Sequence, residues 1–154
     1  MGTEIANSGK SIHLYAIDHW LGSDEDGHRA DEDHARGGLY QVFLENIRPV
    51  ANWVTPIRSD SAAAAALFSD ESVDFLYIDA EHTYAGVCRD IKAWWPKLKR
   101  GSVLAGDDWC FVEAGGAYGV RQAVQEFCSL IGVTPEVLPG EPNVEWEQWR
   151  IFKR

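Results

Sequence analysis

The sequence predicts an α/β domain with a mostly parallel sheet and helices on both faces, because strand-like and helix-like segments alternate along most of the chain. The strand-like segments are continuously apolar inside, which is typical of parallel strands covered on both faces. Two further strand-like segments at the end have no helix between them. We expect one domain with a buried core over residues 1–154.

The first part of the chain contains two strand–helix pairs. SIHLYAID (Ser11–Asp18) is β-branched and aromatic, which favours a strand. Residues 37–50 place apolar side chains on one stripe of a helix. WVTPIRSD (Trp53–Asp60) resembles the first strand, and the alanine run after it favours a helix capped by Asp60 or Ser61.

The same pattern continues beyond the alanine run. VDFLYIDAEH (Val73–His82) and GSVLAGDD (Gly101–Asp108) are predicted to be strands. Residues 84–99 and 118–132 each place apolar side chains on one side of a helix. A proline is expected to stop the first of these helices, and Gly132 the second.

The last two strand-like segments are PEVLPG (residues 135–140) and EWEQWRIFKR (residues 145–154). Parallel strands need a long crossover, usually a helix, and no helix lies between these two. They are therefore predicted to form an antiparallel hairpin at the edge of the sheet.

The charge of the chain argues against nucleic acid and membrane partners. There are 24 acids and 14 bases, giving a formal net charge of -10 that repels phosphate backbones and anionic lipids. No apolar run is long enough for a membrane helix, and the start lacks the apolar centre of a signal peptide, so a cytoplasmic protein is expected. Cys88, Cys110 and Cys128 are widely spaced and are expected to be reduced packing residues.

The segment GSDEDGHRADEDH (Gly22–His34) is strongly biased in composition, with six acids, two histidines and one arginine. This segment is too polar for the core, which favours a solvated loop over a metal-binding tract. Loops of this length beside a site sometimes act as lids.

The predicted parallel strands end in carboxylates, at the edge where open α/β sheets bind ligands. Asp18 could accept hydrogen bonds from the two hydroxyls of a ribose, and a cap or loop role fits it equally well. Asp60 and Ser61 could contact an adenine edge or only cap the alanine helix. Trp20 and Trp109 could wall a ligand pocket, although most tryptophans in such a chain serve packing.

Asp79, Asp107 and Asp108 are more specific candidates for a functional site. If their strands are neighbours, the three carboxylates converge, and their repulsion requires a cation or a shared proton. Oxygen ligands suit magnesium, manganese or calcium rather than zinc, although paired aspartates can also merely cap a turn. His82 follows Asp79 closely and could be a general base, because imidazole ordinarily titrates near about pH 6.5, or it could be a solvated loop histidine.

At these residues the chain resembles the class I S-adenosylmethionine-dependent methyltransferases, especially small-molecule O-methyltransferases of the macrocin and catechol types. The likeness runs from about Ser11 to about Phe127. It is carried in order by LYAIDHWLG, VTPIRSDSAAAAALF, VDFLYIDAEHTYAGVCRDIKAWWPKLKRGSVLAGDDW and YGVRQAVQEF.

The resemblance implies a Rossmann-like fold and transfer of a methyl group from S-adenosylmethionine to a small hydroxylated molecule. In this family an acid at the place of Asp18 holds the cofactor ribose. The residues at the places of Asp60 and Ser61 flank adenine.

The resemblance also implies a catalytic centre. The acids at the places of Asp79, Asp107 and Asp108 correspond to ligands of Mg2+ or another hard divalent cation. The histidine at the place of His82 is the base that takes the proton of the acceptor hydroxyl.

The sequence departs from the family at its beginning, where a strand and a glycine-rich turn are missing. The domain is therefore expected to be N-terminally truncated, and two groups of strands are expected to lack their shared neighbour. The two groups could close directly on each other, another chain could fill the gap, or the chain could be cut from a longer reading frame, which we favour. We expect weak or absent cofactor binding, which would leave this fragment inactive, and a homo-oligomer that covers the exposed sheet edges. The alternatives are a non-catalytic binding or interaction module of the same fold, and a different nucleotide-binding α/β enzyme.

Overall fold

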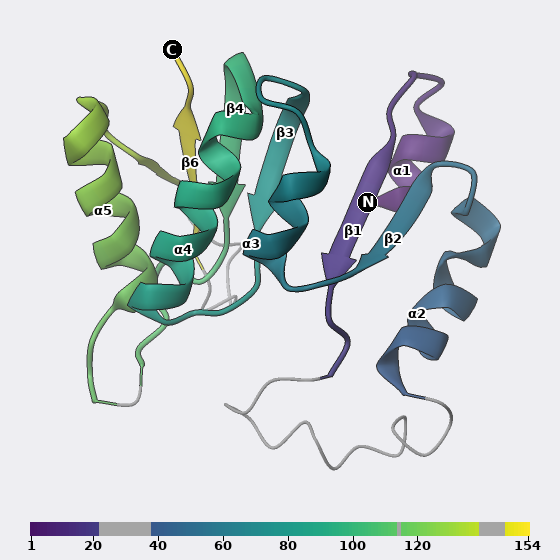
Figure 1. Cartoon of the computed structure of the whole chain (residues 1–154), viewed down its shortest axis with the longest axis horizontal. Coiled ribbons are helices and arrows are strands. Elements are labelled where there is room, and N and C mark those ends of the chain that lie inside the picture. The colour runs from purple at the N-terminus through teal and green to yellow at the C-terminus, as the bar shows by residue number, and fades with distance from the viewer. Residues whose placement is uncertain (22–37, 114, 139–146) are drawn as a thin grey trace. The chain divides into compact units, whose positions relative to one another are not determined.

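A computed structural model of the chain describes residues 1–21, 38–113, 115–138 and 147–154 (Figure 1). The acidic segment Gly22–His34 lies outside the described residues. The structure divides into two compact units, Met1–Ala64 and Ala65–Arg154. Each unit contains its own sheet among the described strands, and each is described by itself.

The N-terminal unit is built on two parallel strands, β1 (Leu14–Asp18) and β2 (Val54–Arg58), paired in register from Leu14 with Val54 to Asp18 with Arg58. Its helices are α1 (Gly2–Asn7), α2 (Leu39–Ile47), which continues as the 3-10 helix η3 (Arg48–Val50), and α3 (Ser61–Ala64).

Trp20 follows β1 and is buried, with 8% of its surface exposed. Its ring lies 4.7 Å from the ring of Tyr40 and 4.9 Å from that of Phe43, both on α2. The turn after β1 is therefore anchored to this helix by aromatic packing.

The C-terminal unit contains a four-stranded sheet in the order β3 (Val73–Ile78), β4 (Leu98–Gly106), β6 (Gln148–Phe152) and β5 (Glu136–Leu138). Strands β3 and β4 are parallel, whereas β6 runs antiparallel to both β4 and β5. The predicted antiparallel hairpin at the sheet edge is confirmed. Among the described strands, β1 and β3 are edge strands of their sheets.

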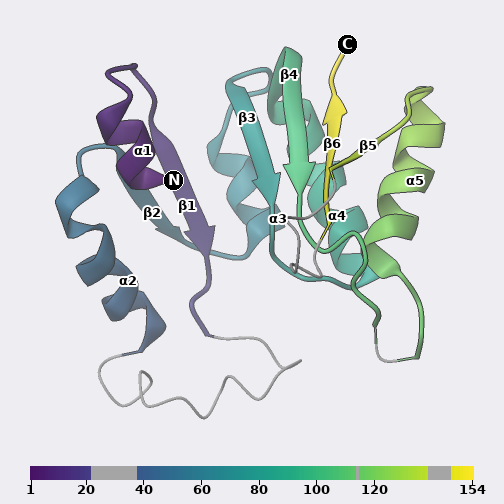
Figure 2. The same cartoon turned by 180° about the vertical axis from the view of Figure 1, so that it is seen from behind.

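Helices α4 (Tyr84–Trp94) and α5 (Gly119–Ile131) cover one face of this sheet, as Figures 1 and 2 show from opposite sides. The core between them contains apolar side chains of both helices and of β3, β4 and β6; these include Ile78, Val87, Ile91, Leu104, Val120, Val124, Trp149 and Ile151. Alternation along the strands places these side chains on the helix-covered face. Two short 3-10 helices, η4 (Ala65–Leu67) and η5 (Trp95–Lys97), complete the unit.

The ends of α4 and α5 follow from local chemistry. The side chain of Thr83 accepts a hydrogen bond from the amide of Gly86 at 3.1 Å, which caps the start of α4. Helix α4 gives way to η5, which contains Pro96 near its start. Helix α5 ends at Gly132, whose φ of 69° is left-handed, as predicted for a glycine stop.

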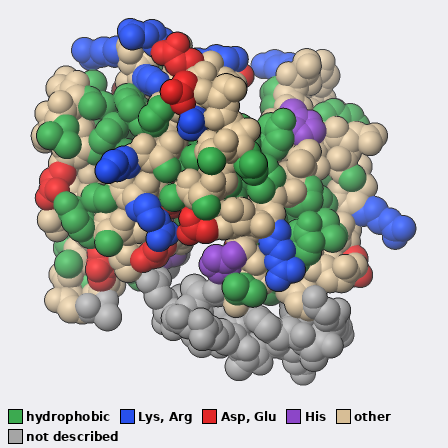
Figure 3. Space-filling model, in the orientation of Figure 1, with side chains coloured by type: hydrophobic (Ala, Val, Ile, Leu, Met, Phe, Trp, Pro, Cys, Tyr) green, Lys and Arg blue, Asp and Glu red, His purple; other side chains and the backbone are tan. Residues whose placement is uncertain are grey.

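The surface charges are mixed. Acidic and basic side chains are interspersed over the face seen in Figure 3. Several pair with one another, such as Lys97 with Asp70 and Lys99 with Asp74, each at 2.7 Å. The cysteines Cys88, Cys110 and Cys128 are unpaired, as predicted. No described helix has the length and apolarity needed to cross a membrane.

Candidate functional site

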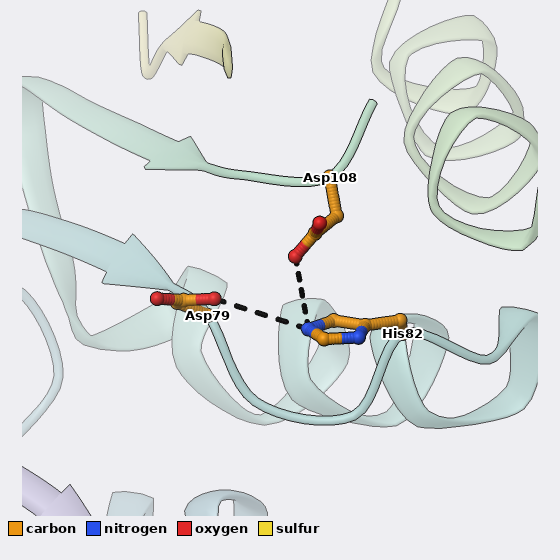
Figure 4. A group of neighbouring side chains, drawn as sticks. All are labelled: Asp79, His82 and Asp108. Carbon is orange, nitrogen blue, oxygen red and sulfur yellow. Dashed lines mark ion pairs between the residues drawn. The ribbon is translucent and has the colours of Figure 1, made fainter. Parts of the chain in front are cut away.

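The loops after β3 and β4 bring together three titratable side chains. Ile78 pairs with Gly106 in the parallel ladder, so the residues that follow leave the same edge of the sheet. The Nε2 atom of His82 lies 2.9 Å from Asp108 Oδ2 and 3.9 Å from Asp79 Oδ1 (Figure 4). One potential ligand atom from each of the three lies within 4.8 Å of the others.

The three side chains differ in exposure. Asp79 is 56% exposed, His82 27% and Asp108 15%. The ring of Phe111 lies 5.0 Å from that of His82 and shields one side of the imidazole. The hollow beside the cluster is also lined by the apolar side chains Ile78, Val87, Val120 and Trp149. The group is therefore open to solvent at Asp79 and enclosed at Asp108.

The direction of Asp108 depends on an unusual backbone conformation. Its φ of 61° lies in the left-handed region, which aspartate tolerates better than most residues. The amide of Asp108 donates to Asp107 Oδ1 at 3.0 Å, and its carbonyl accepts from the amide of Phe111 at 2.9 Å. This turn carries the Asp108 carboxylate toward the imidazole, as Figure 4 shows.

Asp107 lies beside the cluster but is held by other residues. Its Oδ2 atom is 3.3 Å from the hydroxyl of Tyr77, and that hydroxyl accepts from Gln148 Nε2 at 2.8 Å. The backbone carbonyl of Asp107 accepts from Trp149 Nε1 at 3.0 Å. Burial raises the pKa of Tyr77 far above its usual value, and the negative charges of Asp107, Asp79 and Asp108 raise it further. Tyr77 therefore stays protonated and donates.

Gly106 makes this arrangement sterically feasible. A Cβ atom at this position would lie 2.5 Å from Trp149 Cζ2 and 2.7 Å from the carbonyl oxygen of Ile78. Only glycine leaves room for the indole to cross β4 and reach the carbonyl of Asp107.

Glu81, the second acid of the IDAEH stretch, is bound to the start of α4. It accepts from Thr83 Oγ1 at 2.5 Å and lies 3.4 Å from Arg89 Nη2. Gly86 provides the space, because a Cβ there would lie 2.6 Å from Glu81 Cδ. Glu81 is thus a partner of the helix start, whereas Asp79 and His82 on either side of it belong to the cluster.

The predicted cofactor-binding residues all belong to the N-terminal unit. Asp18 Oδ1 accepts from the amide of Trp20 at 2.8 Å, and the Asp18 side chain is 53% exposed. Asp60 Oδ1 accepts from the amide of Ala63 at 2.9 Å, which is a helix cap, and Ser61 is the first residue of α3. Trp20 is packed against α2, as described above. A role of these four residues in cofactor binding stays a prediction.

Asp79, Asp107 and Asp108 were predicted to converge near His82; Asp79 and Asp108 form a group with His82, and Asp107 lies beside it. The contacts of Tyr77 and Gln148 were not predicted. Tyr77 lies two positions before Asp79, so the alternation of a strand places both on one face of the sheet. That spacing was the signal for Tyr77. No local signal indicates Gln148, which lies 71 residues away from Tyr77 along the chain.

Residues 2–109 match the model of a family described as a methyltransferase domain. The chain belongs to this methyltransferase family. The predicted membership in the class I S-adenosylmethionine-dependent methyltransferases is confirmed. The predicted Rossmann-like α/β fold is confirmed by the solved structures that share it. No curated protein sequence matches the chain.

Several solved structures share the fold. The O-methyltransferase NovP is 13% identical, with a TM-score of 0.65, and the match covers 98% of this chain and 64% of NovP. A protein from Corynebacterium glutamicum is 16% identical with a TM-score of 0.60, covering 92% of this chain and 60% of that protein. CalS11, a TDP-rhamnose 3'-O-methyltransferase of calicheamicin biosynthesis, is 17% identical with a TM-score of 0.56, covering 90% and 58%. The chain thus spans less than two thirds of the length of these proteins.

Proposed function

We propose that this methyltransferase-family chain transfers a methyl group from S-adenosylmethionine to a hydroxyl of a small molecule, with the help of a divalent cation. The observation that carries the proposal is the group of Asp79, His82 and Asp108 at adjacent strand ends. Two proteins with this fold, NovP and CalS11, are O-methyltransferases, which supports a hydroxyl acceptor.

The donor set fits a hard divalent cation. Two carboxylates and an imidazole offer ligand atoms within 4.8 Å of one another, and Asp79 remains open to solvent. Carboxylate oxygens suit Mg2+ or Mn2+, with water or substrate completing the coordination. Asp79 and Asp108 would hold the cation. Such a cation lowers the pKa of a bound hydroxyl and fixes its direction.

His82 is the proposed general base. His82 Nε2 lies 2.9 Å from Asp108 Oδ2, so a ring hydrogen on Nε2 would point to that carboxylate and the neutral ring would offer its lone pair at Nδ1. In that tautomer Nδ1 is the ring nitrogen that would take the proton of the acceptor hydroxyl. The hydroxyl oxygen attacks the methyl carbon, the carbon–sulfur bond breaks, its electron pair stays on sulfur, and the proton passes to His82.

The N-terminal unit would supply the cofactor contacts. The exposed carboxylate of Asp18 has the chemistry to accept hydrogen bonds from ribose hydroxyls. Asp60 and Ser61 at the start of α3 would contact the adenine. Trp20 would act by holding the turn that carries Asp18, since its ring is packed against Tyr40 and Phe43.

The test is calorimetric titration with S-adenosylhomocysteine, with Mg2+ or with EDTA, followed by a methyl-transfer assay with catechol as a probe acceptor. We expect weak binding that falls about a further tenfold in Asp18→Asn, because the ribose loses a charged acceptor. Methyl transfer should require Mg2+. A chain that binds neither the cofactor product nor a cation would refute the proposal and favour the non-catalytic binding module.

We further propose that the chain self-associates through its edge strands. Strands β1 and β3 are edges of their sheets, and they carry the exposed aromatic side chains Tyr15 (48%) and Phe75 (52%). Exposed strand edges pair readily with other chains, and lysine on an edge suppresses such pairing. Light scattering after gel filtration should show a dimer or larger species, reduced in Phe75→Lys. A monomer at all concentrations would contradict this proposal.

A further inference from the structure

Asp107 differs from Asp79 and Asp108 in how its carboxylate is used. Oδ2 faces the hydroxyl of Tyr77 at 3.3 Å, and Oδ1 accepts the amide of Asp108 at 3.0 Å. The three-residue group around His82 does not include it. Both carboxylate oxygens of Asp107 are therefore engaged within the protein.

The hydrogen bonds to Asp107 have a defined direction. Gln148 Nε2 can only donate, so the oxygen of Tyr77 accepts from it and the Tyr77 hydrogen points to Asp107. Tyr77 lies on β3 and Gln148 on β6, on either side of β4. The two strands that flank β4 thus orient the Asp107 carboxylate.

This arrangement affects the backbone conformation of Asp108. Its left-handed φ of 61° is sparsely populated by residues other than glycine, so surrounding contacts must maintain it. The bond from its amide to Asp107 Oδ1 spans a single residue and fixes the turn at its first peptide. This turn gives Asp108 Oδ2 its distance of 2.9 Å to His82.

We infer that Asp107 is a positioning residue, which Tyr77 and Gln148 orient so that it holds Asp108 in the conformation needed to face Asp79 and His82. The inference rests on the proposed cation site. It assigns Asp107 a different role from the ligand role that the family resemblance implies. Outer-shell partners of this kind typically change metal affinity by about 10- to 100-fold when mutated.

The first experiment measures Mn2+ affinity by the loss of the free-ion electron paramagnetic resonance signal, in the full chain. We expect Tyr77→Phe to bind Mn2+ about tenfold more weakly and Asp79→Asn about 100-fold more weakly. The matched control is Tyr84→Phe, which removes another tyrosine–carboxylate bond, to Glu126 at 2.6 Å, with no contact to Asp107. It should bind within about twofold of the wild type.

A double-mutant cycle separates positioning from ligation. If Tyr77 acts through Asp107, adding Tyr77→Phe to Asp107→Asn should weaken Mn2+ binding by less than about twofold more. If Asp107 is a direct ligand, Asp107→Asn should lose as much Mn2+ affinity as Asp79→Asn, while hydrogen exchange at the Asp108 amide of metal-free Tyr77→Phe should stay at the wild-type rate. That result would overturn the inference.

A second readout needs no metal. Amide hydrogen exchange, followed by NMR in the metal-free protein, should speed up about tenfold at Asp108 in Tyr77→Phe and in Gln148→Leu. The amide of Trp109, which donates to the carbonyl of Glu147 at 3.0 Å, should be unaffected. Unchanged exchange at Asp108 in both variants would overturn the inference. If the wild type binds no Mn2+ but the exchange effect is present, the cation proposal fails and the positioning role stands.

Discussion

The two parallel strand pairs end in the same kind of residue but use it differently. At the end of β1 and β2, Asp18 accepts the amide of Trp20 and Asp60 the amide of Ala63. At the end of β3 and β4, Asp79 and Asp108 instead both face the Nε2 atom of His82. A carboxylate at a strand end can thus satisfy a local backbone amide or project into a shared site.

The comparison extends to the turns themselves. Trp20 after β1 and Asp108 after β4 both have left-handed φ values, 51° and 61°. In each turn the amide of that residue donates to a preceding aspartate, Asp18 or Asp107. Asp107 is thus the counterpart of Asp18 as a turn-holding acid. What distinguishes the second turn is that its left-handed residue is itself an acid.

The largest expected effect tests whether the site at the ends of β3 and β4 catalyses methyl transfer. His82→Gln should lower the rate of methyl transfer by about 10²- to 10⁴-fold, because the general base is lost. The assay follows formation of S-adenosylhomocysteine at saturating cofactor. His19→Gln, at the end of the first pair, is the matched control and should retain most of the activity. Equal losses of methyl-transfer rate in the two variants would show that His82 has no special catalytic role.

A smaller effect concerns the stability of the C-terminal unit, which contains Cys128, at alkaline pH. Burial raises the pKa of Cys128 to about 11 from its ordinary 9.0. Its stabilising contribution is therefore complete below pH 9 and is lost as the pH rises from 9 toward 11, by about 2 kcal/mol. Denaturant unfolding monitored by circular dichroism should show this loss, and Cys128→Ala should flatten it. An equal alkaline loss in that variant would assign the effect elsewhere.

The smallest expected effect is on the free energy of unfolding, and it compares an acid that caps a helix with an acid of the cluster around His82. Asp60→Ala should cost about 1 kcal/mol of unfolding free energy, because the start of α3 loses its cap. Asp79→Asn should leave the metal-free stability within about 0.5 kcal/mol or raise it, because a converging negative charge is removed. Thermal and urea unfolding in EDTA measure both. A large destabilisation by Asp79→Asn would show that the cluster is structural.

Much of the architecture could be predicted from local patterns. The alternation of strands and helices, the stop at Gly132 and the antiparallel hairpin all depend on neighbours in sequence. The approach of Asp79 to Asp108 could also be predicted, because neighbouring parallel strands release their ends at the same edge.

The roles of adjacent acids could not be predicted in the same way. Asp107 and Asp108 follow one another, and their directions depend on a left-handed peptide and on a tyrosine and a glutamine from other strands. The sequence also gives no sign that Glu81 packs against Gly86, or that Trp20 packs under α2. Such choices depend on side-chain directions and long-range contacts.

The indole of Trp149 makes the site optically visible. This residue is 1% exposed, crosses Gly106 and donates to the carbonyl of Asp107, so its ring lies in the electric field of the acidic cluster. The emission wavelength of an indole depends on the field around it. A cation that neutralises the carboxylates should therefore shift the fluorescence emission of Trp149, so cation binding could be followed without an added label.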